Sequence, residues 1–129
     1  MVEKARAAYD AWSARDLNSF VDIFSEDVEL RPFLGRGLGG SVYRGHEGLR
    51  RWYEEANEEW EELVIEPLEF EEVGDQLMIV LRAIGRGRGS QVQVEAQIVH
   101  VARYRDGKFT RLDGFGDREG ALEALRRVK

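Results

Sequence analysis

Hydrophobic and polar residues alternate along one long stretch, from Gln91 to Tyr104. One parity is mostly apolar and consists of Val92, Val94, Ala96, Ile98, His100, Ala102 and Tyr104. The other parity is polar until Val99 and Val101, where it also becomes apolar. Because successive side chains of a strand point to opposite faces, the pattern predicts a long strand with one buried face. Val99 and Val101 further predict that both faces are covered over its C-terminal half.

A tight turn is predicted directly after this strand. The dipeptide Asp106-Gly107 tolerates positive φ, and Phe109–Phe115 is expected to return as the partner strand. Counting outward from the turn places Tyr104 opposite Phe109. A two-stranded hairpin of this length is not stable alone, so the rest of the chain must supply further strands and helices.

The remaining segments show either the helical or the strand period. Helices are predicted over residues 3–24, with a break at 13–16, over 46–60 and over 118–127. Asp16 and Asp117 are the expected N-caps of the second and last helices. Strands are predicted over residues 28–31, 63–73 and 76–84, and the nearly continuous apolar run of the last makes it central. Pro67 places the strand that contains it at a sheet edge or a bulge.

A glycine-rich segment separates the first predicted strand from the following helix. Residues 33–45 contain five glycines, and residues 33–41 are expected to be mobile beside the mouth of a pocket. The element order predicts a single α+β domain over residues 1–129. Its antiparallel sheet would wrap around the helices and leave a cone with an open end, a natural ligand site.

Composition excludes several kinds of chemistry. The chain has 129 residues and no cysteine, which rules out disulfides, thiolate catalysis and cysteine-based zinc sites. Its two histidines, His46 and His100, match no metal-ligand spacing, so neither a metal nor a cofactor is predicted. The net charge of −6 argues against a nucleic-acid partner. No apolar run approaches the ~20 residues of a membrane span, and a cytoplasmic location is expected.

Several segments together resemble the NTF2-like superfamily and, within it, the SnoaL-like group. They are AYDAWSARDLNSFVDIFSEDVEL, YRGHEGLRRWYEE, GRGRGSQVQVEAQIVHVARYRDGKF and DREGALEAL. The resemblance implies a cone-shaped fold with a pocket for a small hydrophobic molecule. The superfamily includes ketosteroid isomerases, polyketide cyclases and epoxide hydrolases, so the fold locates the pocket but leaves its chemistry open.

The residues of the ketosteroid isomerase-like members are largely missing. Their aspartate base would fall near Arg31, and their long-strand aspartate at Val99. Tyr9 lies close to their first-helix tyrosine but one residue out of register. Epoxide hydrolase-like members use an aspartate and an arginine two apart on the long strand, whereas Glu95 and Arg103 are separated by about 26 Å of strand. Neither mechanism is expected in its usual form.

SnoaL-like cyclases imply an acid–base residue in the pocket, for which His100 and Asp113 are the candidates. Continued from the turn, the hairpin register places these two opposite each other, close enough to share a hydrogen bond. A histidine oriented by a carboxylate is a suitable catalytic base near neutral pH. The alternative interpretation is a structural histidine on the sheet or at a dimer interface.

Further residues are expected to line the pocket. They are Tyr9, Trp12, Phe24, Phe33, Trp52, Val99, Val101 and Phe115. Three hypotheses stay open: an isomerase, cyclase or hydrolase acting on a hydrophobic cyclic substrate, a carrier without an acid–base pair, and an interaction domain whose own aromatic residues fill the cone. A homodimer through the outer face of the sheet is predicted, because the broad outer face of a small cone must be covered, charged or paired.

Overall fold

The computed structural model describes residues 1–32, 42–89 and 92–127. The glycine-rich segment 33–41, for which mobility was predicted, lies outside the described residues. The helices are α1 (Val2–Ser13), α2 (Leu17–Asp22), α3 (Gly45–Glu59) and α4 (Arg118–Arg127). The strands are β1 (Phe24–Arg31), β2 (Tyr43–Arg44), β3 (Trp60–Val73), β4 (Gln76–Gly87), β5 (Gln93–Arg105) and β6 (Lys108–Phe115).

Local sequence signals explain where the helices begin and end. Asp16 caps α2, accepting a hydrogen bond from the backbone amide of Ser19 at 3.3 Å. Asp117 caps α4 in the same way through the amide of Gly120 at 2.8 Å. The predicted break in the N-terminal helix is also present, because Arg15 adopts a positive φ of 60° between α1 and α2. The hydrogen bonds of Asp16 and Asp117 confirm both predicted N-caps.

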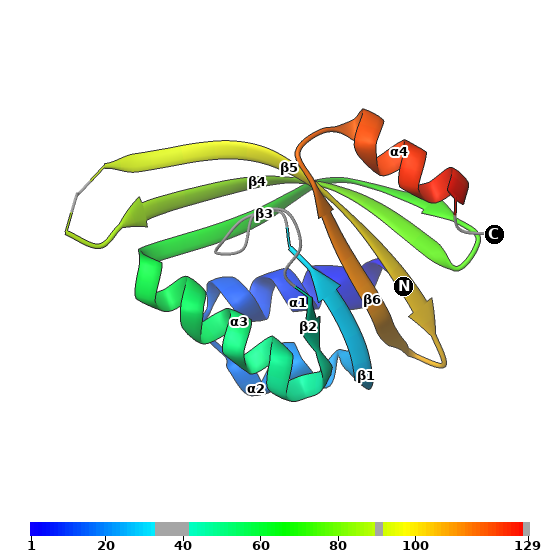
Figure 1. The fold of residues 1–129 in the computed structure, drawn as a ribbon, viewed down its shortest axis with the longest axis horizontal. Coiled ribbons are helices and arrows are strands. Elements are labelled where there is room, and N and C mark those ends of the chain that lie inside the picture. Colours follow the sequence, from blue (N-terminus) through cyan, green and yellow to red (C-terminus); the bar gives the residue numbers. More distant parts are fainter. Residues whose placement is uncertain (33–41, 90–91, 128–129) are drawn as a thin grey trace.

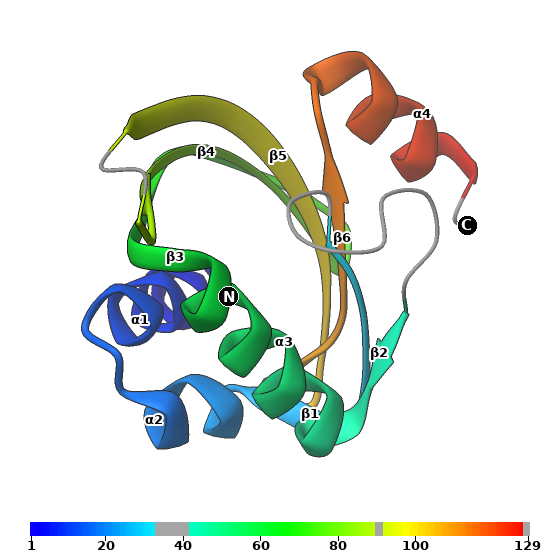
Figure 2. The same cartoon turned by 60° about the vertical axis from the view of Figure 1, so that its left-hand side comes forward.

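The strands form one sheet in the order β2-β1-β6-β5-β4-β3. The sheet curves around α1 and α3, while α4 lies on its opposite face (Figure 1, Figure 2). This arrangement confirms the predicted α+β cone. The sheet is not wholly antiparallel, however, because β1 pairs with β6 in parallel. Within the described ranges, no helix has both the length and the apolar character needed to cross a membrane.

The predicted edge strand and central strand are both confirmed. β3 is the last strand of the sheet, and its register with β4 shifts between Pro67 and Glu69, so the proline lies beside a bulge. In β4, Leu77 to Leu81 are buried without interruption. Leu77, Ile79 and Leu81 belong to the main core, whereas Met78 and Val80 belong to a second cluster.

The two clusters lie on opposite faces of the sheet. The main core fills the concave face and is closed by α1, α2 and α3. The second cluster covers the convex face beneath α4, and its buried members are Met78, Val80, Val99, Val101 and Ala121. The central strands are thus covered on both sides, as the apolar residues on both parities predicted.

The position of α4 bears on the predicted homodimer. The apolar centre of the convex face is covered by this helix of the same chain. Around it the face carries ion pairs such as Arg82–Glu66 at 3.1 Å and Arg82–Glu95 at 3.3 Å. The dimer was expected because a broad outer face must be covered, charged or paired, and α4 and these ion pairs already provide cover and charge there. Dimerisation stays a prediction.

The packing of α4 can be tested at Ala121, which is fully buried against the sheet. We expect Ala121→Asp to lower the free energy of unfolding by about 2–4 kcal/mol, because it places an unpaired charge in an apolar interface. Leu122→Asp, on an exposed position of the same helix, is the control and should change it by less than about 1 kcal/mol. Urea unfolding measures both, and equal losses would contradict the assigned interface.

Candidate functional site

A small cavity lies inside the cone, between the helices and the concave face of the sheet. Its lining is apolar except for Tyr9 and His100 and includes Trp12, Phe20, Phe24, Trp52, Ile65, Ile79, Phe109 and Leu112, with Ala5, Ala8 and Ala102. These side chains leave about 20 Å³ of free space, room for about one water molecule. We call this space the inner cavity.

A second cavity of about 20 Å³ lies next to the first. It is lined by Tyr43, Trp52, Glu55, Ala56, Glu59, Trp60, Leu63, Ile65, Ile98 and His100, and we call it the outer pocket. Trp52, Ile65 and His100 line both spaces and therefore form the wall between them. Unlike the inner cavity, the outer pocket includes carboxylates.

Aromatic contacts hold the wall in place. The ring of Trp52 lies against that of Trp12, with centroids 4.5 Å apart. Tyr53 and Phe20 meet Trp12 edge-on, at 5.2 and 5.4 Å. Much of the space that the cone encloses is therefore filled by the protein's own rings.

His100 is the only histidine that lines either cavity within the described residues, and this residue is 3% exposed. Its Nδ1 lies 2.7 Å from the hydroxyl of Tyr9, and the two rings stack with centroids 5.8 Å apart. α1 supplies the tyrosine and β5 the histidine, 91 residues later in the chain. This hydrogen bond joins two groups that would each be costly to bury alone.

Burial determines the protonation state of both partners. It lowers the pKa of His100 to about 4, so the imidazole is neutral at pH 7. It raises the pKa of the Tyr9 phenol, which therefore keeps its proton. Among the described residues, Nδ1 of His100 is the acceptor for the hydroxyl proton of Tyr9. We therefore assign the Tyr9 hydroxyl as donor, which leaves the imidazole proton on Nε2.

The Nε2–H group of His100 is the polar group that the site offers to a ligand. The described residues provide it with no hydrogen-bond partner, while the imidazole lines both cavities. A neutral imidazole in this tautomer donates a hydrogen bond and is a poor base at pH 7. The site can therefore bind or polarise an oxygen of a ligand.

The predicted partnership of His100 and Asp113 is wrong. Tyr104 does pair with Phe109, as counted from the turn, but Arg103 then pairs with Arg111, so that Thr110 is an extra residue in β6. This bulge shifts the remaining register by one. His100 lies opposite Gly114, and Asp113 lies opposite Val101.

Asp113 consequently has other partners. Its neighbour Val101 belongs to the cluster beneath α4, which places the carboxylate on the convex face. Nε of Arg111 donates to its Oδ2 at 2.8 Å, and Arg31 approaches its Oδ1 at 3.8 Å. Asp113 is thus part of an ion-pair cluster on the opposite face from His100.

The structure also divides the residues that were expected to line the pocket. Tyr9, Trp12, Phe24 and Trp52 line the inner cavity. Val99, Val101 and Phe115 do not, because they face α4 on the convex side. Alternation explains the error, since position 100 faces inward and its two neighbours face outward. Phe33 lies outside the described residues.

Of the residues that line the outer pocket, only Trp52 and His100 were among the predicted site residues, and both carboxylates were missed. Glu55 and Glu59 belong to an acidic run along α3, which a solvent-facing helix surface would also produce. Tyr43 donates to Glu55 Oε1 at 2.5 Å and holds that carboxylate beside the pocket. The four-residue spacing of the two glutamates places them on one helix face, and this was the available signal.

The curved sheet around helices and the interior cavity define the NTF2-like class of folds. Residues 5–112 match the family described as the SnoaL-like domain, and the chain belongs to this family. A search of curated proteins finds no match.

Solved structures of the same fold cover nearly the whole chain. TerC, co-crystallised with polyporic acid, has 23% identity and a TM-score of 0.80, over 97% of each chain. A ketosteroid isomerase-like protein from Catenulispora acidiphila, in complex with trimethylamine, has 17% identity and a TM-score of 0.80, over 94% of this chain and 90% of that one. RV0760c from Mycobacterium tuberculosis, in complex with estradiol-17beta-hemisuccinate, has 17% identity and a TM-score of 0.76, over 92% and 94%.

The buried histidine predicts a specific dependence of stability on pH. As the pH falls below about 6.5, the unfolded chain protonates His100, while the folded protein does not until about pH 4. Proton binding then favours the unfolded state, so the free energy of unfolding should fall by about 3 kcal/mol across this range from His100 alone. Above pH 6.5 this contribution is absent.

The double variant Tyr9→Phe/His100→Leu isolates this effect, because it removes both partners and leaves neither without a hydrogen bond. Urea unfolding between pH 7 and pH 4 should show a shallower loss in the variant than in the native protein. Asp113→Asn is the control for the register, and the NMR signals of the His100 ring should not change in it. Parallel pH curves for the native protein and the double variant would contradict the assigned protonation state.

Proposed function

We propose that this protein binds a small, hydrophobic, ring-containing molecule that carries a carbonyl or hydroxyl oxygen. The observation that carries the proposal is the Tyr9–His100 hydrogen bond of 2.7 Å inside an otherwise apolar cavity. It orients an imidazole Nε2–H donor where an apolar ligand would lie. An oxygen on the ligand would satisfy this donor, and the ring system would contact the surrounding aromatic side chains.

Ligand entry requires the wall between the two spaces to move. Each cavity alone has about 20 Å³ of free space, which is too little for a ring. Trp52 is the largest shared wall residue and projects from α3. A change in its rotamer would join the inner cavity to the outer pocket. Binding is therefore expected to perturb Trp52 more than the buried core of the sheet.

If the protein is an enzyme, the geometry supports a role for His100 as a hydrogen-bond donor to a ligand carbonyl. Such a donor would stabilise negative charge that develops on the oxygen during an isomerisation or cyclisation. A separate base would have to remove the proton, since His100 is neutral with a pKa of about 4 and Asp113 lies on the convex face. Binding without chemistry requires only the donor and the apolar walls.

A second candidate function is an interaction domain that binds no small molecule. The small free volume and the packed rings of Trp12 and Trp52 favour it. In that case the buried Tyr9–His100 pair would serve only to fix the packing of α1 on β5.

The two functions can be distinguished with a matched pair of ligands, 1-tetralone and tetralin, which differ by one carbonyl oxygen. We expect the native protein to bind 1-tetralone about 3–10-fold more tightly, as one hydrogen bond to a neutral donor contributes. Tryptophan fluorescence, which reports on Trp12, Trp52 and Trp60, and calorimetry measure the two affinities.

The double variant Tyr9→Phe/His100→Leu provides the control. It should bind tetralin as the native protein does and lose the preference for the ketone. Equal binding of both ligands to the native protein would contradict the role of Nε2–H. Failure of both to bind, even at millimolar concentration, would favour the interaction domain.

A further inference from the structure

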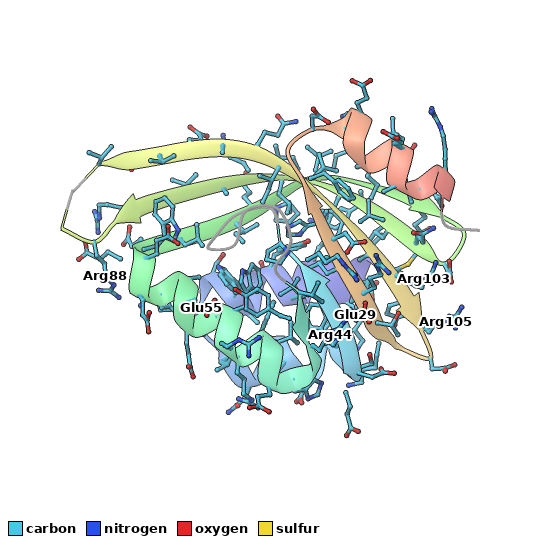
Figure 3. All side chains as sticks on the ribbon, in the orientation of Figure 1. Glu29, Arg44, Glu55, Arg88, Arg103 and Arg105 are labelled. Carbon is cyan, nitrogen blue, oxygen red and sulfur yellow. The ribbon has the colours of Figure 1, made fainter. Side chains whose placement is uncertain are left out.

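The outer pocket combines aromatic rings with carboxylates. Trp52 and Trp60 line it together with Glu55 and Glu59, and within the described residues its lining contains no lysine or arginine. Figure 3 shows Glu55 on α3, on the side toward the sheet. The same pocket includes His100, whose Nε2 has no hydrogen-bond partner among the described residues. Polar groups of two kinds thus converge on one apolar space.

The positions of the Glu55 and Glu59 carboxylates on α3 are electrostatically unfavourable. Glu55 and Glu59 are four residues apart on α3, so their charges repel each other. Glu59 is also the last residue of the helix, where the backbone carbonyls carry partial negative charge, and the last turn has no basic residue. A positive charge in the outer pocket would reduce both repulsions.

Two arginines lie near the outer pocket, and each has a partner of its own. Nε of Arg88 donates to the backbone carbonyl of Asn57 at 2.7 Å, and this side chain lines a separate surface hollow with Glu54 and Glu58. Arg51 lies over the ring of Tyr43, 5.1 Å from its centroid. Neither arginine lines the outer pocket.

One aromatic ring is well placed to meet a cation. Trp60 begins β3 and lies over Gly85, where an added Cβ would be 2.7 Å from the indole Cε3. This close approach requires glycine and fixes the position of the indole beside the carboxylates. Tryptophan gives the strongest cation–π contacts of the aromatic side chains, and the contact is stronger where the cation is shielded from water.

We propose that the outer pocket is a subsite for an ammonium group, which deepens the proposed function by defining its ligand as an amphiphilic amine. The apolar ring would lie against Trp52, with an oxygen at Nε2 of His100. The protonated amine would lie between Trp60 and the carboxylates of Glu55 and Glu59. The inference rests on the proposed function for the binding of the ligand's apolar ring. It rests on the residues of the outer pocket for the binding of the ligand's ammonium group.

Two bicyclic probes test the charge preference, 2-aminotetralin, which is cationic at pH 7, and neutral 2-tetralol. They share one ring system and differ in the substituent. We expect the native protein to bind the amine at least about 10-fold more tightly at low ionic strength, with the preference reduced by added salt. Calorimetry at two salt concentrations measures both affinities.

The variant Glu55→Gln/Glu59→Gln should reduce this preference to within about 2-fold while it leaves the affinity for 2-tetralol unchanged. Glu54→Gln is a control, because it removes a charge from the same helix at a residue that does not line the outer pocket, and it should retain most of the preference. Trp60→Leu should weaken amine binding several-fold. Circular dichroism and urea unfolding establish that each variant is folded.

The outcomes separate this inference from the proposed function. If 2-tetralol and 1-tetralone bind but the amine has no advantage, the ammonium subsite is wrong and the apolar site stands. If the amine preference persists in the double glutamine variant, the attraction comes from the overall negative charge, and the inference is again overturned. If none of the probes binds, both proposals fail.

Discussion

Cover on both faces of the central strands is the constraint on which the rest of the structure depends. β4 and β5 contribute one set of side chains to the core beneath α1 and α3 and the other set to the cluster beneath α4. From Leu77 to Leu81 and from Ile98 to Ala102, every residue must therefore suit one of two apolar surroundings. His100 falls on the concave side by this alternation, and it is tolerated there because the Tyr9 hydroxyl satisfies one ring nitrogen and burial keeps the imidazole neutral.

Much of the fold could be predicted from the sequence because its signals are local. The alternation before Tyr104, the turn at Asp106-Gly107 and the caps Asp16 and Asp117 all depend on residues within a few positions of one another. The parallel pairing of β1 with β6 depends on segments far apart in the chain and leaves no local pattern. The overall cone was predicted because the resemblance to a family supplied the missing long-range information.

The site was harder to predict because one inserted residue changes the face of everything that follows it. Thr110 is accommodated as a bulge in β6, and the apparent pairing of His100 with Asp113 disappears beyond it. The actual partner of His100 comes from α1, at a distance in sequence that no hairpin count can reach. Glu55 was not predicted as a site residue for a different reason. An acidic run on a helix is usually solvated, and only the tertiary structure shows which of its residues face a cavity.

The parallel pair of β1 and β6 has a consequence for how the chain folds. β1 completes its hydrogen bonding only when it pairs with β6. Leu30 therefore cannot pair until Leu112 is in place, and Tyr9 cannot form its hydrogen bond until His100 is in place. Contacts between such distant segments slow folding, because a long loop must close before they contribute stability. During synthesis the helices α1 and α2 would therefore leave the ribosome before the strands that cover their aromatic side chains, and the inner cavity would form only after Leu112 has emerged.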